Sequence, residues 1–267
     1  ILFFIPKSLI DFVFIFKKDI KRGYIFDSQS RILISLMPKL DLHKIKDSEI
    51  PKIRNLINKK RNAIRLSRRP KKKVITKDYF INESSGIKIR EYEPYATDNE
   101  NIILYFHGGG YVLNSIDTHD TTVSYFSEKL RTKVFSLAYS LSPEKKFPFA
   151  TNEAIAALNW LTKNGYLMEN ISLCGDSAGA HLAASVVHSL AFDNKKNVNS
   201  QFLIYPMCDP GCSSESFEIF KDGYSLTKDA MIWFWDKFKN NKHDDFNDAF
   251  NLLLLDTNNK FPRTIIV

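Results

Sequence analysis

The spacing of apolar and polar residues changes near residue 74. Before that point apolar side chains recur at helical intervals, most clearly over residues 50–67. Beyond it, short apolar runs of strand length alternate with longer helical patterns. Such alternation is typical of a mostly parallel sheet with helices on both faces. We therefore expect an α/β core over 74–267, preceded by a helical cap and basic linker over 1–73.

The individual elements can be placed from the same spacing. The expected helices span 28–37, 50–67, 118–130, 149–163, 178–191 and 228–239. The expected strands span 74–81, 87–92, 101–106, 133–137, 171–174, 201–205 and 264–267. The first two strands are separated by Ser85-Gly86, which predicts an antiparallel hairpin.

A serine flanked by glycines lies between an expected strand and an expected helix, in Gly175-Asp176-Ser177-Ala178-Gly179. This G-x-S-x-G pattern is typical of a nucleophile elbow, a sharp turn at which strand and helix backbones approach so closely that only glycine fits. The helix N-terminus carries a partial positive charge that suits a developing oxyanion. Ser177 is therefore the candidate nucleophile, with an ordinary structural turn as the alternative.

A second glycine-rich segment, His107-Gly108-Gly109-Gly110-Tyr111, directly follows an expected strand. Residues without side chains let backbone N–H groups approach a ligand oxygen closely. Acyl transfer needs such donors, because its tetrahedral intermediate concentrates negative charge on the former carbonyl oxygen. The segment indicates an oxyanion hole, with a glycine loop required only for tight packing as the alternative.

Together the two motifs resemble the hormone-sensitive-lipase-like branch of the α/β-hydrolases, also called the GDXG lipolytic enzymes. The likeness extends to Tyr-Ser-Leu-Ser-Pro-Glu-Lys-Lys-Phe-Pro at 139–148, Leu-Ile-Tyr-Pro at 203–206 and Gly-Tyr-Ser-Leu-Thr at 223–227. Cys174 departs from the family, which prefers Ala or Ser there. The resemblance implies an α/β-hydrolase fold with its last strand and helix missing. It also implies hydrolysis of a small-molecule carboxylic ester through an acyl-serine intermediate, without metal or organic cofactor.

The resemblance also implies roles for single residues. Ser177 is the expected nucleophile. The expected oxyanion hole comprises Gly108, Gly109, Gly110 and Ala178. Within it the N–H groups of Gly109, Gly110 and Ala178 are the expected donors, and Gly108 shapes the turn. His107 and Asp176 are expected to support the site through hydrogen bonds. Because a base must reach the serine, we expect His119, His181 and His188 to be helix residues without a catalytic role, independently of the resemblance.

A serine needs a base to take its proton and an acid to orient that base. The family places the acid after the strand that starts here at Thr264, and the histidine after the next strand. No histidine follows His243. Asp209 and His243 are weaker candidates for the acid and base. The sequence thus predicts either a fragment of a longer ester hydrolase or a truncated, catalytically defective chain.

Charge and cysteine usage add little to this interpretation. The net charge of +8 is concentrated over 59–73, which favours a solvated helix end and linker over a surface for anionic lipid. No recognition motif accompanies the charge, so nucleic acid is not an expected partner. The three cysteines lack disulfide or metal spacing, which favours a reducing, cytoplasmic location.

The first sixteen residues are strongly apolar, but Lys7 and Asp11 interrupt them and they are too short to cross a bilayer. We expect an amphipathic cap helix, with Phe12, Phe14 and Phe16 as candidate lining of an acyl pocket. The remnant of a signal or anchor is the alternative. Peripheral membrane contact through residues 1–16 would suit a membrane-associated acyl-binding module, the competing functional class.

Overall fold

The computed structural model describes residues 7–13, 20–36, 41–67, 74–81, 86–192, 197–256 and 261–267. The chain divides into two compact units: Ile1–Lys44 with Cys212–Trp233, and Ile45–Gly211 with Phe234–Val267. This division differs from the expected boundary between residues 73 and 74. The helix Ile50–Ser67 belongs to the larger unit, and a segment from the second half of the sequence belongs to the smaller one.

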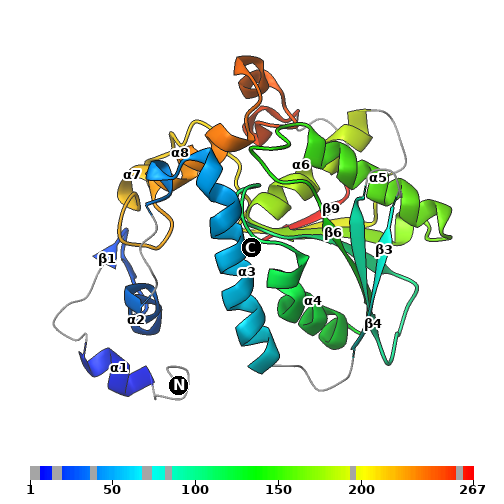
Figure 1. The fold of residues 1–267 in the computed structure, drawn as a ribbon, viewed down its shortest axis with the longest axis horizontal. Helices are drawn as coiled ribbons and strands as arrows, with labels where there is room; N and C mark the ends of the chain where they lie inside the picture. Colours follow the sequence, from blue (N-terminus) through cyan, green and yellow to red (C-terminus); the bar gives the residue numbers. More distant parts are fainter. Residues whose placement is uncertain are drawn as a thin grey trace. The chain divides into compact units, whose positions relative to one another are not determined.

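A seven-stranded sheet forms the centre of the larger unit (Figure 1), in the order β3-β4-β6-β5-β7-β8-β9. Its strands are β3 (Val74–Phe80), β4 (Lys88–Pro94), β5 (Ile102–Phe106), β6 (Lys133–Ala138), β7 (Ile171–Asp176), β8 (Ser200–Ile204) and β9 (Arg263–Ile266). β4 pairs antiparallel with both β3 and β6, and every other pairing is parallel. The predicted α/β class with a mostly parallel sheet is confirmed.

Helices pack on both faces of this sheet (Figure 1). The α-helices that lie wholly in the larger unit are α3 (Ile50–Ser67), α4 (Ile116–Leu130), α5 (Phe149–Lys163) and α6 (Ala178–Phe192). Short 3-10 helices are η3 (Asp47–Glu49), η4 (Met168–Asn170), η5 (Lys242–Phe246) and η6 (Leu252–Leu254). α6 packs against β5, β7 and β8, while α4 packs against β3, β4 and β6 and against α3. The apolar face predicted for 149–163 is buried in α5.

The smaller unit contains α1 (Lys7–Val13), β1 (Ile20–Lys21), β2 (Tyr24–Ile25), α2 (Ser28–Leu36), η2 (Leu42–Lys44), α7 (Glu215–Ile219) and the first part of α8 (Lys228–Phe238). β1 and β2 form a short antiparallel hairpin, where only helices were expected. Tyr224 packs on the rings of Phe26 and Phe220, at centroid distances of 5.0 and 5.2 Å. The contact between Phe26 and Tyr224 joins the two sequence segments of the unit.

Two expectations for the N-terminal residues can be compared with the structure. Phe12 is largely exposed, whereas Phe14 and Phe16 lie outside the described residues. Among the residues that the structure describes, no helix is long and apolar enough to cross a membrane.

Candidate active site

The two glycine motifs meet at one edge of the sheet. β5 and β7 are parallel neighbours, with Phe106 opposite Gly175. His107 is the first residue after β5, and Ser177 is the first after β7. The parallel strands therefore deliver the glycine loop and the serine turn to the same carboxyl edge, where open α/β sheets bind their ligands.

Ser177 has the strained backbone expected of a nucleophile elbow. Its φ of 54° lies in the left-handed region, which costs a non-glycine residue on the order of 1–2 kcal/mol. Hydrogen bonds hold this conformation: the Ser177 N–H donates to the Ile204 carbonyl at 2.8 Å, and its carbonyl accepts from the His181 N–H at 3.0 Å. The Ser177 side chain is half-buried, and Ser177 directly precedes Ala178, the first residue of α6. The positive end of the helix dipole is therefore next to the hydroxyl.

The elbow's glycines are required by close backbone approach. An ideal Cβ on Gly179 would lie 2.0 Å from the Phe106 carbonyl oxygen, and one on Gly175 would lie 2.3 Å from the Gly179 carbonyl carbon. Any side chain at either position would push the first turn of α6 away from β5 or β7. The sequence pattern therefore reflects the packing of helix against strand.

In the glycine loop, Gly108 differs from the next two residues. Its N–H donates to Asp176 Oδ1 at 2.9 Å and is not available to a ligand. Within the described part of the chain, the Gly109 and Gly110 N–H groups have no hydrogen-bond partner. Gly110 has a φ of 60°, and a Cβ there would lie 2.1 Å from the ring of Phe234. The loop thus presents two unpaired donors.

Asp176 connects the elbow to this loop. Besides the Gly108 N–H, its Oδ1 accepts the Tyr105 hydroxyl at 2.6 Å, and its Oδ2 lies 3.4 Å from His119 Nε2. Burial raises the pKa of the Asp176 carboxyl, but the contacts with His119, Tyr105 and the Gly108 N–H outweigh burial and hold that pKa below its ordinary value. The carboxylate is therefore ionised at neutral pH and stabilises the loop as an acceptor.

His107 is fully buried in the same region. Its Nδ1 donates to the Gly108 carbonyl at 2.9 Å, and its own carbonyl accepts the Tyr139 hydroxyl at 2.6 Å. The imidazole stacks on the Tyr139 ring at a centroid distance of 4.4 Å. Burial lowers the pKa of His107 to about 4, with the nearby His119 as a second cause. The ring is therefore neutral at physiological pH and contributes no positive charge to the site.

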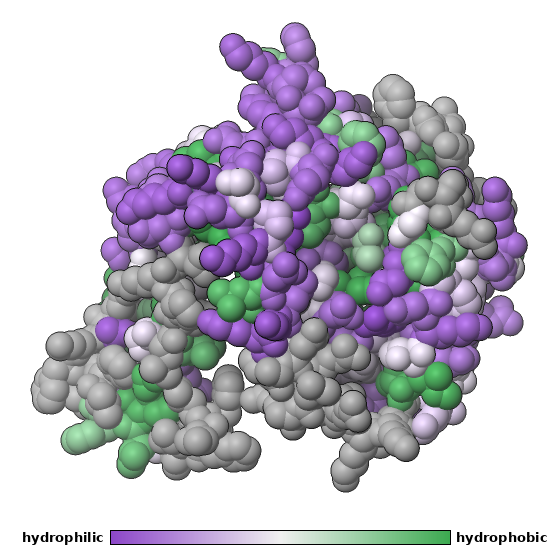
Figure 2. All heavy atoms as spheres, viewed as in Figure 1, coloured by the Kyte–Doolittle hydropathy of each residue, from purple (hydrophilic) through white to green (hydrophobic). Residues whose placement is uncertain are grey.

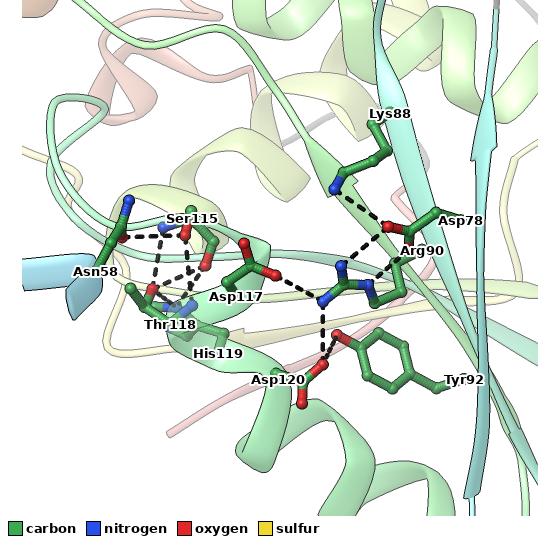
Figure 3. Close-up of polar contacts among 10 residues, drawn as sticks. All are labelled: Asn58, Asp78, Lys88, Arg90, Tyr92, Ser115, Asp117, Thr118, His119 and Asp120. Carbon is green, nitrogen blue, oxygen red and sulfur yellow. Dashed lines mark hydrogen bonds and ion pairs between the residues drawn. The ribbon is translucent and has the colours of Figure 1, made fainter. Parts of the chain in front are cut away.

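The start of α4 holds His119 in place (Figure 3). Thr118 Oγ1 lies 3.0 Å from His119 Nδ1, and the Ser115 side chain caps the helix by accepting the Thr118 N–H. The Arg90 guanidinium on β4 binds three carboxylates, that of Asp78 on β3 and those of Asp117 and Asp120 in the first turns of α4. Arg90 thereby ties β3 and β4 to α4, the helix that supplies His119.

None of the six histidines is hydrogen bonded to the Ser177 hydroxyl in the described structure. His181 is buried between the Tyr111 hydroxyl, 2.6 Å from its Nδ1, and the Phe250 carbonyl, 2.8 Å from its Nε2. His188 Nε2 lies 3.0 Å from an Asp248 oxygen. His107 and His119 have the partners described above, and His43 and His243 are exposed.

The two weaker candidates for acid and base are placed as follows. Asp209 Oδ1 accepts the Gly211 N–H at 2.9 Å, which closes a tight turn after β8. His243 is exposed on η5, and its backbone N–H donates to the Asn241 side chain at 2.8 Å. Their roles stay predictions. In the described residues no group of three or more His, Cys, Asp and Glu side chains could hold a metal ion.

Comparison with known proteins places this chain in a family. A family profile for the alpha/beta hydrolase fold matches residues 103–267. The ethyl acetate hydrolase of Pseudomonas putida is 30% identical over 176 residues, 63% of this chain. The arylesterase of Saccharolobus solfataricus is 30% identical over 198 residues, 72% of this chain. The chain spans 55% of the length of the first relative and 64% of the second.

A solved structure agrees with these matches. The hyperthermophilic esterase of the archaeon Pyrobaculum calidifontis superposes with a TM-score of 0.77 at 26% identity, over 88% of this chain and 77% of that enzyme. The chain belongs to the α/β-hydrolase fold family, in its hormone-sensitive-lipase-like branch. The resemblance stated from the motifs is therefore confirmed.

Proposed function

We propose that this protein hydrolyses small carboxylic esters through an acyl intermediate on Ser177. The observation that carries the proposal is the placement of Ser177, on a strained turn at the N-terminus of α6, beside a loop with two unpaired N–H donors. Relatives named ethyl acetate hydrolase and arylesterase support an ester as the substrate class.

In the first half of this reaction, the Ser177 oxygen bonds to the ester carbonyl carbon while its proton passes to a base. The carbonyl oxygen becomes an oxyanion, which would accept hydrogen bonds from the N–H groups of Gly109, Gly110 and Ala178. The C–O bond to the alcohol then breaks, and the alcohol leaves with the proton. In the second half, water attacks the acyl-serine by the same steps and releases the acid.

The reaction needs a base for the Ser177 proton, and the surroundings of the six histidines indicate whether one of them can act as that base. Four of them have partners other than Ser177, and His43 and His243 are exposed. We therefore propose that none of the six takes the proton of Ser177. The base and its acid partner would come from residues outside these 267, consistent with the greater length of the relatives.

Hydrolysis by the complete gene product tests the proposal. p-Nitrophenyl esters with acyl chains of increasing length would measure both the activity and its chain-length preference. We expect hydrolysis by the parent protein and a loss of about 10⁴-fold or more in Ser177→Ala, because the nucleophile is removed. A folded parent without hydrolysis of any ester, or a Ser177→Ala variant with full activity, would overturn it.

We also propose that the smaller unit contacts membrane surfaces peripherally. Leu9 and Phe12 of α1 are exposed, as are Ile20, Tyr24 and Ile25 of the short hairpin. Apolar surface is visible in this part of the molecule in Figure 2. Exposed apolar side chains on an amphipathic element can enter the headgroup region of a bilayer.

Vesicle co-sedimentation tests this second proposal. The parent should sediment with vesicles that contain anionic lipid, and a Leu9→Asp, Phe12→Asp double variant should remain in the supernatant. The exposed Tyr125→Asp substitution in the larger unit is the matched control and should leave binding unchanged. Absence of parental binding to any vesicle would refute peripheral membrane contact without affecting the proposed esterase activity.

A further inference from the structure

Arg54 of α3 reaches the segments that support the glycine loop, all within the larger unit. Its Nε donates to the Val112 carbonyl at 2.6 Å, and its Nη2 donates to the Ser142 carbonyl at 2.5 Å. The Arg54 side chain is only 16% exposed. These two bonds join α3 to two loops that are 58 and 88 residues away in sequence.

Glu144 completes the surroundings of this guanidinium. Its two carboxylate oxygens accept from Arg54 Nη1 and Nη2, at 2.8 and 2.9 Å. The hydrogen bond from Arg54 holds the pKa of the Glu144 carboxyl below its ordinary value, so the pair is ionised at neutral pH. A bidentate pair of this kind fixes the plane of the guanidinium, and therefore also the direction of its bonds to the two carbonyls.

The two carbonyls belong to the turn that follows the glycines and to a neighbouring loop that is hydrogen bonded to Tyr111. Val112 and Leu113 donate their N–H groups to the Gly109 carbonyl at 3.0 and 2.8 Å, which makes the tight turn that orients the glycines. The Ser142 N–H donates to the Tyr111 carbonyl at 2.8 Å. Arg54 thus bonds both to the turn and to the neighbouring loop that supports it.

We propose that Arg54 is a positioning residue for the oxyanion hole: it fixes the turn that aims the Gly109 and Gly110 N–H groups. The inference rests on the proposed ester hydrolysis. Without the guanidinium, the Val112 and Ser142 carbonyls lose their charged donor, and the turn can relax. A small displacement of preorganised donors weakens their hydrogen bonds to the transition state more than it weakens binding of the substrate. Loss of Arg54 should therefore lower kcat and leave KM nearly unchanged.

Arg54→Lys and Arg54→Met in the complete gene product test this role. The lysine retains the charge but cannot make the forked set of bonds, whereas the methionine retains only the apolar stem. The matched control is Arg131→Lys, because Arg131 forms an exposed ion pair with Asp98. Each variant would be measured for kcat, KM, affinity for a boronic acid that forms a tetrahedral serine adduct, thermal unfolding, and amide exchange over 109–113.

We expect kcat to fall by about 10- to 100-fold in Arg54→Met, with a smaller fall in Arg54→Lys. Boronate affinity should fall in parallel, amide exchange over 109–113 should accelerate, and Arg131→Lys should match the parent. Folded Arg54 variants with parental kcat and boronate affinity would overturn the inference while the proposed function stands. An inactive parent would overturn the proposed function, and unchanged exchange over 109–113 would then also refute the positioning of the loop by Arg54.

Discussion

Gly179 lies directly against the end of β5: an ideal Cβ on it would be 2.0 Å from the Phe106 carbonyl oxygen. On helix propensity alone, alanine at this position in α6 should stabilise the helix by about 1 kcal/mol. The backbone contact opposes this, and relief of such overpacking costs about 1–3 kcal/mol or more. The clash therefore dominates, because neither the strand end nor the first helical turn can move independently.

We accordingly predict that Gly179→Ala lowers the free energy of unfolding by about 2 kcal/mol, measured by urea denaturation. Gly165→Ala is the control, since nothing lies within 4 Å of its ideal Cβ and only its φ of 93° opposes the substitution. The control should lose about 1 kcal/mol. Equal or greater stability of Gly179→Ala would show that α6 does not begin against β5 in this way.

The ion pairs of Arg90 with Asp78, Asp117 and Asp120 predict a contribution to the free energy of unfolding that is lost in acid (Figure 3). The hydrogen bond from Arg90 lowers the pKa of Asp78 from 3.8 to about 2. A depressed carboxyl pKa stabilises the fold above pH 4, and this contribution is lost as the pH falls from about 4 to 2. Because Asp78 is 35% exposed, solvent screening reduces the contribution to about 1 kcal/mol.

Urea unfolding of the parent and of Asp78→Asn between pH 2 and 5 measures this component. The variant should be less stable than the parent at pH 5, and the difference should shrink towards pH 2. Asp98→Asn is the control, because both side chains of the Asp98–Arg131 ion pair are exposed to solvent. A stability difference for Asp78→Asn that stays constant from pH 5 to 2 would contradict the predicted titration.

Two buried histidines should remain neutral at pH values well below the ordinary pKa of histidine. Burial lowers the pKa values of His107 and His181 to about 4. The unfolded chain takes up these protons near pH 6.5 and the folded chain does not, so stability should fall as the pH drops from 6.5 towards 4. Imidazole chemical shifts in NMR spectra should show neither ring titrating between pH 5 and 8. A midpoint above 6 for either ring would contradict its burial in the neutral form.

The two weaker candidates for catalytic acid and base can be tested together. The Asp209 carboxylate closes a local turn, and His243 is exposed. Asp209→Asn and His243→Ala should therefore retain hydrolysis within about twofold of the parent, because neither change removes a group from the reacting atoms. A fall of 10³-fold or more in either variant would instead identify the missing member of the catalytic set.

Much of the larger unit could be predicted from local patterns. The helices expected over 50–67 and 149–163 are found with the same bounds, because apolar spacing and proline boundaries specify them locally. The β1–β2 hairpin was missed, since two-residue strands are too short to show a period of two. The division into compact units differs from the expected boundary, because α3 contacts residues far along the chain.

Some residues of the candidate site could likewise be predicted from the sequence, and others could not. Ser177 and the glycines stand out in the sequence because close backbone approach restricts their positions to very small residues. Arg54, Tyr105 and His119 do not stand out, although each contacts the glycine loop, its supporting turn or Asp176. Their roles follow from which strands and helices are neighbours in the fold. Nothing in the local sequence around them indicates these partners.

The central claim is that Ser177 is an activated nucleophile. The most direct measurement is treatment of the complete gene product with a fluorophosphonate, followed by mass spectrometry of the peptide that contains Ser177. Phosphonylation joins the serine oxygen to phosphorus and expels fluoride, so it requires both a base and an oxyanion site. The account predicts stoichiometric labelling at Ser177 in the parent and none in Ser177→Ala. An unlabelled Ser177 in a folded protein that hydrolyses esters would contradict it.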